Sequence, residues 1–320
     1  RRPPRPTLFP YTTLFRSIQA ILVNDKQIPV LVSEGKAIFE FPLKLKPGVQ
    51  NVTITAMDPS GNSAIYGFKA LLESRGWFGE EMPFGMTKYK YYGEYLWEKD
   101  KSIMVFVPKG EFVYKRSSKD PEKKHLESFY IDKYETTWRQ YRQFCRETAS
   151  PYPDRKVQES HPVVELSLQE IKKFMEWVGK TMPSMAHWIK ASRGGIEVPS
   201  WNDQLSPMIE NPLPQRLYPW GEDFESVSSQ SIHRCNYIGL KKKDGDSNTT
   251  PVGIFSYPSP YRCYDMMGNV WELCATQDGS AVKTGGGFKS GRSQCRIGFY
   301  SVWDEKGEED IGFRLVKRMD

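Results

Sequence analysis

The segment that most limits the possible folds of this chain begins at Gly194, because helical and strand periodicity almost disappear after it. Gly, Asn, Pro and Trp interrupt the sequence at short intervals from there to the C-terminus. Gly and Pro break both helices and strands, so such a segment folds mainly as turns and loops. We therefore expect a fold held together by loop packing, turns and bound ions. With 38% hydrophobic and 26% charged residues, the chain still has an ordinary globular composition, which excludes collagen-like, coiled-coil and wholly disordered proteins.

Two amphipathic helices are predicted before this segment. Thr137 fits the N-cap of the first, whose apolar residues recur at helical spacing: Trp138, Tyr141, Phe144 and Cys145. In the second, Ser167 and Glu170 have the spacing of a capping box, in which each side chain accepts a hydrogen bond from the other's backbone N–H. This helix is expected to end at Gly179.

Short strands separated by turns are predicted for residues 18–72. Apolar and polar residues alternate from Val52 to Ala56, as in a half-buried antiparallel strand. Further strands are expected at Ala20–Val23, Ile28–Val32 and Ala37–Leu43. The VND turn and the later DPSGN turn resemble bacterial Ig-like repeats of cell-surface proteins, which implies a small, incomplete all-β Ig-like sandwich that serves as a spacer. Residues 73–100 show no clear period and are expected to form a linker that packs partly on the domain after it.

Residues 1–17 resemble the in-frame translation of a sequencing adaptor, so we exclude them from the fold. The true N-terminus, with any signal sequence, is then expected to be missing. The segment holds four arginines and no acid, and without it the net charge falls from +6 to +2. Basicity therefore gives no reason to expect nucleic acid as a partner. No apolar run approaches the roughly 18 residues of a membrane helix, so no membrane span is expected in the visible chain.

The five cysteines and four histidines form neither a CxxC pair nor an HExxH motif. The cysteines are also odd in number, so a fully paired disulfide framework is not indicated. A metal site built from clustered His or Cys side chains is not expected.

Nine motifs from residue 104 onward share the order and spacing of one known family. They are Met104–Phe112, Phe129–Thr137, His161–Val164, Gly179–Pro183, Arg193–Gly195, Tyr218–Gly221, Thr250–Gly253, Tyr264–Glu272 and Ile311–Arg314. In these motifs residues 101–320 resemble the formylglycine-generating enzyme, or sulfatase-modifying factor, family. The resemblance implies an α+β, C-type-lectin-like fold with little regular secondary structure.

The resemblance also implies two structural calcium sites. For the first site, the implied ligands are the side chains of Asn236 and Asp244 and the carbonyls of Tyr237 and Asp246. For the second site, they are the side chains of Asp265 and Glu272 and the carbonyls of Gly268 and Val270. The Asp244-Gly245-Asp246 turn by itself gathers oxygen atoms that suit a hard cation, although such a turn is more often only solvated.

Active members of the family hold Cu(I) with two cysteines while they oxidise a cysteine of sulfatases to formylglycine. Cys295 meets the second cysteine position, but Ser290 occupies the first, and a hydroxyl cannot replace a thiolate for this soft ion. Gly287 and Gly291 stand where the enzymes have a serine and a histidine. Copper is therefore not expected. Cys295 is expected to be packed in the core or disulfide-bonded, with Cys274 the nearest candidate partner.

A third helix is expected to begin near Ser184 and to carry Trp188. Met185 and His187 stand where the family pattern has acids, so we expect the capping box to fail here. His187 is expected on the helix surface and not as a general base.

Two functions are the main alternatives, and we favour the first. One is a non-oxidase surface or periplasmic binding or accessory module, whose groove takes a peptide, protein or glycan. Aromatic residues that could line the groove are Trp201, Tyr218, Trp220, Tyr237, Tyr300 and Trp303. The other is a formylglycine-generating oxidase-type enzyme with altered chemistry around Cys295. A scaffold protein is a third alternative, and the expected location is extracytoplasmic.

Overall fold

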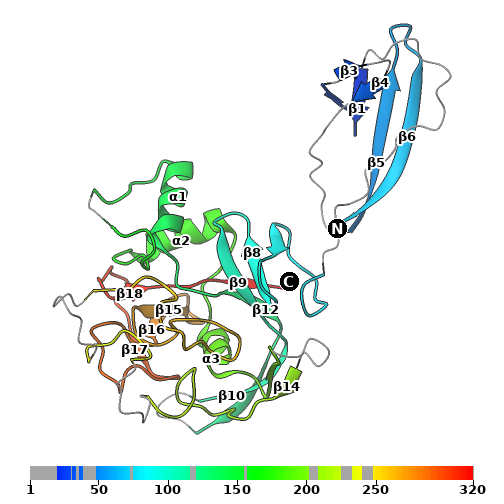
Figure 1. The fold of residues 1–320 in the computed structure, drawn as a ribbon. Coiled ribbons are helices and arrows are strands. Elements are labelled where there is room, and N and C mark those ends of the chain that lie inside the picture. The colour runs from blue at the N-terminus through cyan, green and yellow to red at the C-terminus, as the bar shows by residue number, and fades with distance from the viewer. Residues whose placement is uncertain are drawn as a thin grey trace. The chain divides into compact units, whose positions relative to one another are not determined.

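The computed structural model describes residues 20–29, 31–33, 36–38, 48–72, 75–115, 120–154, 157–201, 208–224, 233–239 and 248–319. The chain divides into two compact units, Arg1–Arg75 and Gly76–Asp320 (Figure 1). The adaptor-like residues 1–17 lie outside the described part.

The first unit is all-β in its described part. A four-stranded antiparallel sheet has the order β2-β1-β5-β6, and β3 pairs with β4 in a separate hairpin. The strands are β1 (Ala20–Val23), β2 (Lys26–Ile28), β3 (Leu31–Ser33), β4 (Lys36–Ile38), β5 (Gly48–Met57) and β6 (Ser63–Leu72). The predicted alternation is confirmed, because Val52, Ile54 and Ala56 are buried. The relation of this unit to Ig-like repeats stays a prediction.

One strand expected in this unit differs from those observed, and another can be compared only in part. The expected strand Ile28–Val32 is divided, because β2 ends at Ile28 and β3 begins at Leu31. Of the expected strand Ala37–Leu43, residues 39–43 lie outside the described part. The turn between β1 and β2 agrees with expectation: Asn24 and Asp25 have φ of 48° and 64°, the left-handed geometry of a tight hairpin turn that Asn and Asp tolerate.

The second unit is built on a five-stranded antiparallel sheet of order β19-β12-β9-β8-β7. Its strands are β7 (Met86–Lys88), β8 (Glu94–Trp97), β9 (Ser102–Val107), β12 (Phe129–Asp132) and β19 (Val316–Arg318). Of the segment 73–100 that was expected to be a linker, residues 76–100 belong to this second unit, and β7 and β8 lie within it. The strands are too short and too rich in Tyr, Lys and Glu to show an apolar alternation, and only their pairing in the sheet reveals them.

Helices cover the two faces of this sheet (Figure 1). They are α1 (Trp138–Thr148), α2 (Leu168–Val178) and α3 (Met185–Arg193). Along β9, Met104 and Phe106 pack in one core with α1 and α2, while Val105 and Val107 pack in a second core with α3. Because successive side chains of a strand point to opposite faces of the sheet, β9 contributes residues to both cores. No helix in the described part is long and apolar enough to cross a bilayer.

The predicted start of α1 and the predicted start and end of α2 are confirmed. Thr137 and Ser167 are N-caps, and each forms a capping box with the residue three positions later. Gly179 ends α2 in the left-handed conformation, with φ of 71°. These caps satisfy backbone groups that the first and last turns leave without partners.

The prediction that the third capping box fails is wrong. The Ser184 amide donates to His187 Nδ1 (3.3 Å), and the His187 amide donates to Ser184 Oγ (3.3 Å). The imidazole therefore performs the role that Glu or Gln usually has at this position. Burial of the ring, with smaller contributions from Arg318 and Lys190, lowers the pKa of His187 to about 4.

This cap makes stability depend on pH. Because the folded-state pKa of His187 lies below the usual 6.5, the contribution is fully present above pH 6.5 and is lost as pH falls towards 4. We expect the loss to approach about 3 kcal/mol. Urea unfolding between pH 4 and 7 would measure it. His187→Gln keeps a capping side chain without a titrating group, so it should flatten the profile; an unchanged slope in this variant would contradict the assignment.

Outside the five-stranded sheet, the second unit has only short strands in its described part, and all of them except β10 and β11 lie after residue 194. A four-stranded sheet has the order β17-β16-β15-β18, and two hairpins, β10–β11 and β13–β14, lie outside it. The strands are β10 (Gly110–Tyr114), β11 (Glu122–Leu126), β13 (Glu197–Pro199), β14 (Met208–Glu210), β15 (Trp271–Ala275), β16 (Ala281–Thr284), β17 (Tyr300–Val302) and β18 (Ile311–Gly312). The predicted fold dominated by loops is confirmed in this region.

Candidate functional site

The loop that carries Cys295 comes after β16 and is closed by its own hydrogen bonds. Ser290 is 3% exposed, and its Oγ accepts the Gly287 amide at 2.9 Å. The Ser290 carbonyl accepts the Ile238 amide at 3.1 Å. The Cys295 amide donates to the Gly291 carbonyl at 3.3 Å. The Ser290 hydroxyl therefore helps to shape the loop.

Cys295 lies directly beneath Gly286. Its side chain is 0% exposed, and a Cβ atom built on Gly286 would lie 2.7 Å from its Sγ. Gly286 also has φ of 75°, so both packing and backbone geometry require glycine here. Glycine allows the backbone to cover the thiol.

All five cysteines lie in the described part, and all are buried free thiols. The disulfide that was one of two alternatives for Cys295 is therefore not formed with Cys274. Burial raises the pKa of Cys263 to about 11 and raises that of Cys274 well above its usual value. These two sulfurs are accordingly protonated thiols at neutral pH.

Three buried carboxylates meet near β15. Glu272 receives two hydrogen bonds of 2.6 Å from Arg314, and Trp188 Nε1 donates to it at 2.8 Å. Glu135 accepts Asn269 Nδ2 at 2.7 Å and the Val270 amide at 3.3 Å. Asp265 accepts the Gly253 amide at 2.5 Å. These contacts tie β15 to the sheet and to the loops on either side.

The acids outnumber the arginine at this place. Burial raises the pKa of Asp265 to about 6. Burial and the neighbouring Asp265 and Glu272 raise the pKa of Glu135 well above its usual value, while Arg314 opposes this shift. The cluster therefore carries more negative charge than its arginine neutralises whenever the acids ionise.

Aromatic rings and arginines alternate on a surface close to the Cys295 loop. We call Tyr218, Trp220, Phe224, Tyr257, Arg234 and Arg292 the aromatic–arginine face. The Tyr218 and Trp220 rings are parallel to within 8°, with centroids 5.7 Å apart, and Phe224 lies 5.3 Å from Tyr218. Arg292 lies 5.5 Å from the Phe224 ring, and Arg234 lies 5.3 Å from Tyr257. Flat rings and planar guanidinium groups pack together in this way through cation–π contact.

Several buried nitrogens of this region have no hydrogen-bond partner among the described residues. They are His233 Nδ1, Arg234 Nε and Arg296 Nε. An arginine Nε–H is a donor only, so two of the three positions call for an acceptor. Since these nitrogens are buried, the guanidinium that the face presents at its surface is that of the exposed Arg292.

The second unit matches a known protein family in sequence. A family model described as "Sulfatase-modifying factor enzyme 1-like domain" matches residues 97–319. The chain belongs to this sulfatase-modifying factor family. The α+β fold expected from the motifs is confirmed.

Proteins with similar sequences carry different names. The chain is 33% identical over 122 residues to the formylglycine-generating enzyme of Thermomonospora curvata, which covers 36% of this chain and 33% of the relative. It is 29% identical over 136 residues to the inactive C-alpha-formylglycine-generating enzyme 2 of Bos taurus, covering 42% and 40%. It is 28% identical over 199 residues to the serine/threonine-protein kinase pkn1 of Chlamydia caviae, covering 53% and 27%.

The chain thus spans between about a quarter and two fifths of the length of these relatives. Among solved structures, PvdO from Pseudomonas aeruginosa matches with a TM-score of 0.54 and 20% identity, over 72% of this chain and 100% of that one. These names range from an enzyme to an inactive homologue and a kinase. Membership of the family therefore establishes the fold, whereas the activity has to be argued from the residues of the site.

The structure describes only two of the four implied ligands of the first calcium site, Asn236 and Tyr237. Asp244 and Asp246 lie outside the described residues. Asn236 is buried, and its Nδ2 donates to the Asn248 carbonyl at 3.0 Å and to Asn269 Oδ1 at 3.2 Å. Tyr237 is buried beside it. This site stays a prediction.

Of the implied ligands of the second calcium site, Asp265 and Glu272 are both buried and lie close enough for their charges to interact. Gly268 packs against the Asn236 backbone, where a Cβ atom would lie 2.3 Å from its carbonyl oxygen. Glu272, however, is bound by Arg314 and Trp188. Among the described residues, no group of three or more His, Cys, Asp or Glu side chains has the arrangement of a metal site. A cation here would rely on Asp265 and on the Gly268 and Val270 carbonyls.

Half of the predicted groove aromatics gather at the aromatic–arginine face or beneath it, namely Tyr218, Trp220 and Tyr237. The others do not join them. Trp201 packs with Phe78, Tyr92 and Arg262, Tyr300 lies in β17, and Trp303 is buried with its Nε1 bonded to the Lys306 carbonyl at 2.7 Å. Sequence reasoning missed Phe224, Tyr257 and the arginines, although Arg292 and Arg296 flank Cys295 in the sequence.

Proposed function

We propose that this domain is a non-oxidase member of the sulfatase-modifying factor family, which binds an acidic peptide segment on its aromatic–arginine face. The observation that carries the first part is Ser290. It stands at a copper-ligand position of the active enzymes, and its hydroxyl accepts the Gly287 amide at 2.9 Å. Cu(I) favours two thiolates, and one buried thiol with one engaged hydroxyl does not fit it.

The surroundings of Gly287 support the same conclusion. A Cβ atom at this position would lie 2.9 Å from the Asp310 carbonyl oxygen and 3.2 Å from Trp271. The serine that the active enzymes have here would need the backbone to shift. Neighbouring atoms therefore already fill the space that a side chain at position 287 would need.

The aromatic–arginine face supports the second part of the proposal. Arg292 of this face is exposed, so its guanidinium can donate hydrogen bonds to the carbonyls and carboxylates of a peptide. Apolar rings beside it can hold aliphatic or aromatic side chains. An acidic peptide supplies both kinds of contact.

Copper binding and turnover of a CxPxR peptide under air test the first part. We expect neither stoichiometric Cu(I) nor formylglycine in the wild-type protein, and Cys295→Ser should behave as the wild type does. Stoichiometric Cu(I) that disappears in Cys295→Ser would overturn the non-oxidase assignment. A family enzyme with both cysteines serves as the positive control.

Titration with a fluorescent Asp/Glu-rich peptide tests the second part. Arg292→Gln should weaken binding roughly tenfold, since a charge-assisted hydrogen bond is lost. Arg139→Gln, which affects an exposed arginine paired with Glu159 at 3.4 Å, is the matched control and should leave affinity unchanged. Equal loss in both variants would contradict the placement, and binding of an acidic glycan without binding of the peptide would refute the peptide assignment.

We also propose that calcium binds at Asp265 with the Gly268 and Val270 carbonyls. Hard oxygen ligands in a buried acidic cluster suit this ion, which would clamp the loops around β15. At a calcium concentration about 100 times the dissociation constant, stability should rise by about 2.7 kcal/mol. Thermal unfolding with calcium and with EDTA measures this. Asp265→Asn should abolish the difference, whereas Asp304→Asn, at an exposed acid, should retain it; a difference that survives Asp265→Asn would contradict the site.

A further inference from the structure

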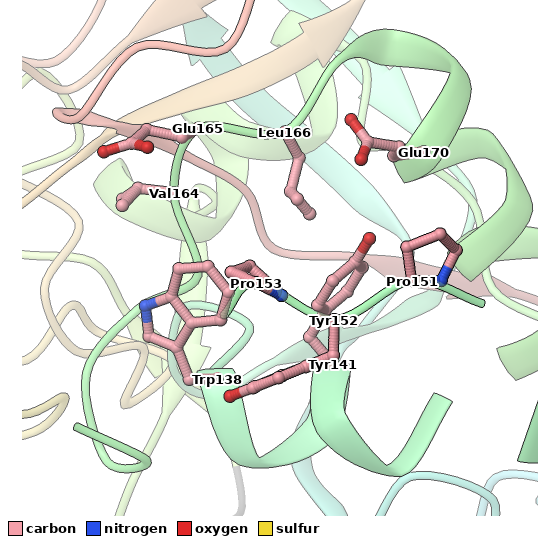
Figure 2. A pocket seen from close by; sticks show the side chains of 9 residues that line it. All are labelled: Trp138, Tyr141, Pro151, Tyr152, Pro153, Val164, Glu165, Leu166 and Glu170. Atoms are coloured by element: carbon pink, nitrogen blue, oxygen red, sulfur yellow. The ribbon is translucent and has the colours of Figure 1, made fainter. Parts of the chain in front are cut away.

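A second site lies between α1, the segment 151–153, the segment 164–166 and the first turn of α2. It is a pocket of about 390 Å³, within the roughly 300–1,000 Å³ typical of small-ligand sites. Figure 2 shows Trp138 and Tyr141 on one side of the pocket, with Val164, Glu165 and Leu166 across from them. The pocket shares no residue with the aromatic–arginine face or the Cys295 loop.

Aromatic rings form a large part of its wall. The Trp138 ring makes edge contacts with Tyr141 and with Tyr152, each at 6.1 Å between centroids. Trp138 and Tyr141 are 4% and 3% exposed, so packing fixes their positions. The electron-rich faces of Trp and Tyr attract cations, and the attraction increases when water is excluded.

The charged side chains that line the pocket are both acids, Glu165 and Glu170. Glu170 Oε2 accepts the Ser167 amide at 2.8 Å in the capping box of α2, and Oε1 has no hydrogen-bond partner among the described residues. Arg142 lies 5.1 Å from the Tyr152 ring, but it is paired with Glu159. Glu170 therefore gives the pocket a negatively charged acceptor, which favours a cation over an anion.

A buried hydroxyl here lacks a partner. Tyr152 Oη is buried and makes no hydrogen bond within the part of the chain that the structure describes. In Figure 2 it points towards the side of the pocket where Glu170 lies, although no hydrogen bond joins the two. An unsatisfied buried hydroxyl costs roughly 1–3 kcal/mol, which a bound polar group would relieve.

The backbone at the opposite wall is strained. Glu165 has φ of 64°, a left-handed value that is uncommon outside glycine. Its amide donates to the Glu308 carbonyl at 3.1 Å, and Gly307 packs against its backbone. Strain of this kind is retained where surrounding structure fixes it, often at ligand sites.

We propose that this pocket binds a primary ammonium group, either of a free alkylamine or of a lysine side chain. In the proposed complex the ammonium donates to Tyr152 Oη and to Glu170 Oε1, and its methylene stem packs against Trp138 and Leu166. A guanidinium needs acceptors arranged in one plane, whereas an ammonium is a compact charge with rotatable donors. The assignment is independent of the proposed function.

Calorimetric titration with n-butylammonium and with butan-1-ol tests the charge requirement. We expect binding of the ammonium alone. Glu170→Gln keeps the capping box, because Gln is also favoured at this position, and should weaken binding roughly tenfold. Tyr152→Phe should weaken it several-fold. Glu176→Gln, on the same helix but outside the pocket, should bind as the wild type does.

A lysine-containing peptide and its norleucine analogue distinguish the two sources of the ammonium group. Binding of the free amine, of the lysine peptide, or of both supports the site, and the stronger ligand identifies the source. Binding of neither overturns the proposal. It is also overturned if butan-1-ol binds as tightly as butylammonium, or if Glu170→Gln and Glu176→Gln bind alike while both retain the wild-type unfolding midpoint.

Discussion

Replacement of Lys180 by methionine is expected to lower the free energy of unfolding by about 3–5 kcal/mol. Lys180 comes directly after α2 and its C-cap, and its Nζ donates to Asp100 at 2.9 Å, to Asp132 at 2.8 Å and to Ser102 at 2.8 Å. The lysine side chain is 0% exposed, and the two carboxylates are 1% and 3% exposed. Although burial alone lowers the pKa of Lys180, the two aspartates raise it above its usual value.

The expected loss comes from the aspartates that remain. Methionine fills a similar volume, but Asp100 and Asp132 would then be buried without a counter-charge. A domain of this size is stable by only about 5–15 kcal/mol, so the variant should be close to unfolding at neutral pH. It should recover part of its stability at lower pH, where protonation removes the buried charge.

Urea unfolding of the wild type and the variant measures the effect. Lys289→Met is the matched control, because Lys289 pairs with Glu309 at the surface, where the two side chains are 47% and 54% exposed. That pair should contribute less than about 1 kcal/mol. If the two variants lose similar amounts of unfolding free energy, the buried cluster contributes no more to stability than a surface ion pair does.

Replacement of Arg314 by lysine should cost about 2–4 kcal/mol, although the charge is kept. Arg314 Nε and Nη2 each donate to Glu272 at 2.6 Å, and Nη2 also donates to the Tyr264 carbonyl at 2.7 Å. Nη1 donates to the carbonyls of Asp132 and Lys133 at 3.2 and 3.1 Å. An ammonium cannot satisfy these acceptors from a single nitrogen, so some would stay buried and unpaired.

Comparison with Arg314→Met separates geometry from charge. The methionine variant should lose more, about 3–5 kcal/mol, because Glu272 would then be buried without a counter-charge. Chemical denaturation of the three proteins gives both differences. If the lysine variant matches the wild type, the fork geometry of Arg314 is irrelevant to stability.

Local features were predictable from the sequence because neighbouring residues determine them. The caps at Thr137 and Ser167 and the end of α2 at Gly179 depend on side-chain chemistry within one turn. The alternation at Val52, Ile54 and Ala56 depends on the two-residue period of one strand. The failed prediction at His187 had a local cause too, since imidazole Nδ1 can accept the hydrogen bond that an acid usually accepts.

The candidate sites were predictable only in part. Position 290 could be compared with the family motif, so the departure at Ser290 was visible in the sequence. The aromatic–arginine face was not, because Arg234 and Tyr257 come from loops far apart in the chain and only packing brings them together. The pocket beside Tyr152 had no sequence signal, since Trp138 and Tyr141 show the helical spacing of ordinary core residues.

The sequence by itself determined the family fold, the caps at Thr137, Ser167 and Gly179 and the serine at position 290, because motifs and caps are encoded within short segments. Only the tertiary structure decided that residues 86–97 belong to the main sheet, that Glu272 pairs with Arg314, and that Cys295 remains a buried free thiol. The physical reason is that pairing, burial and counter-charge depend on which distant segments meet. In a chain held together largely by loops, contacts between distant segments leave no periodic pattern in the sequence.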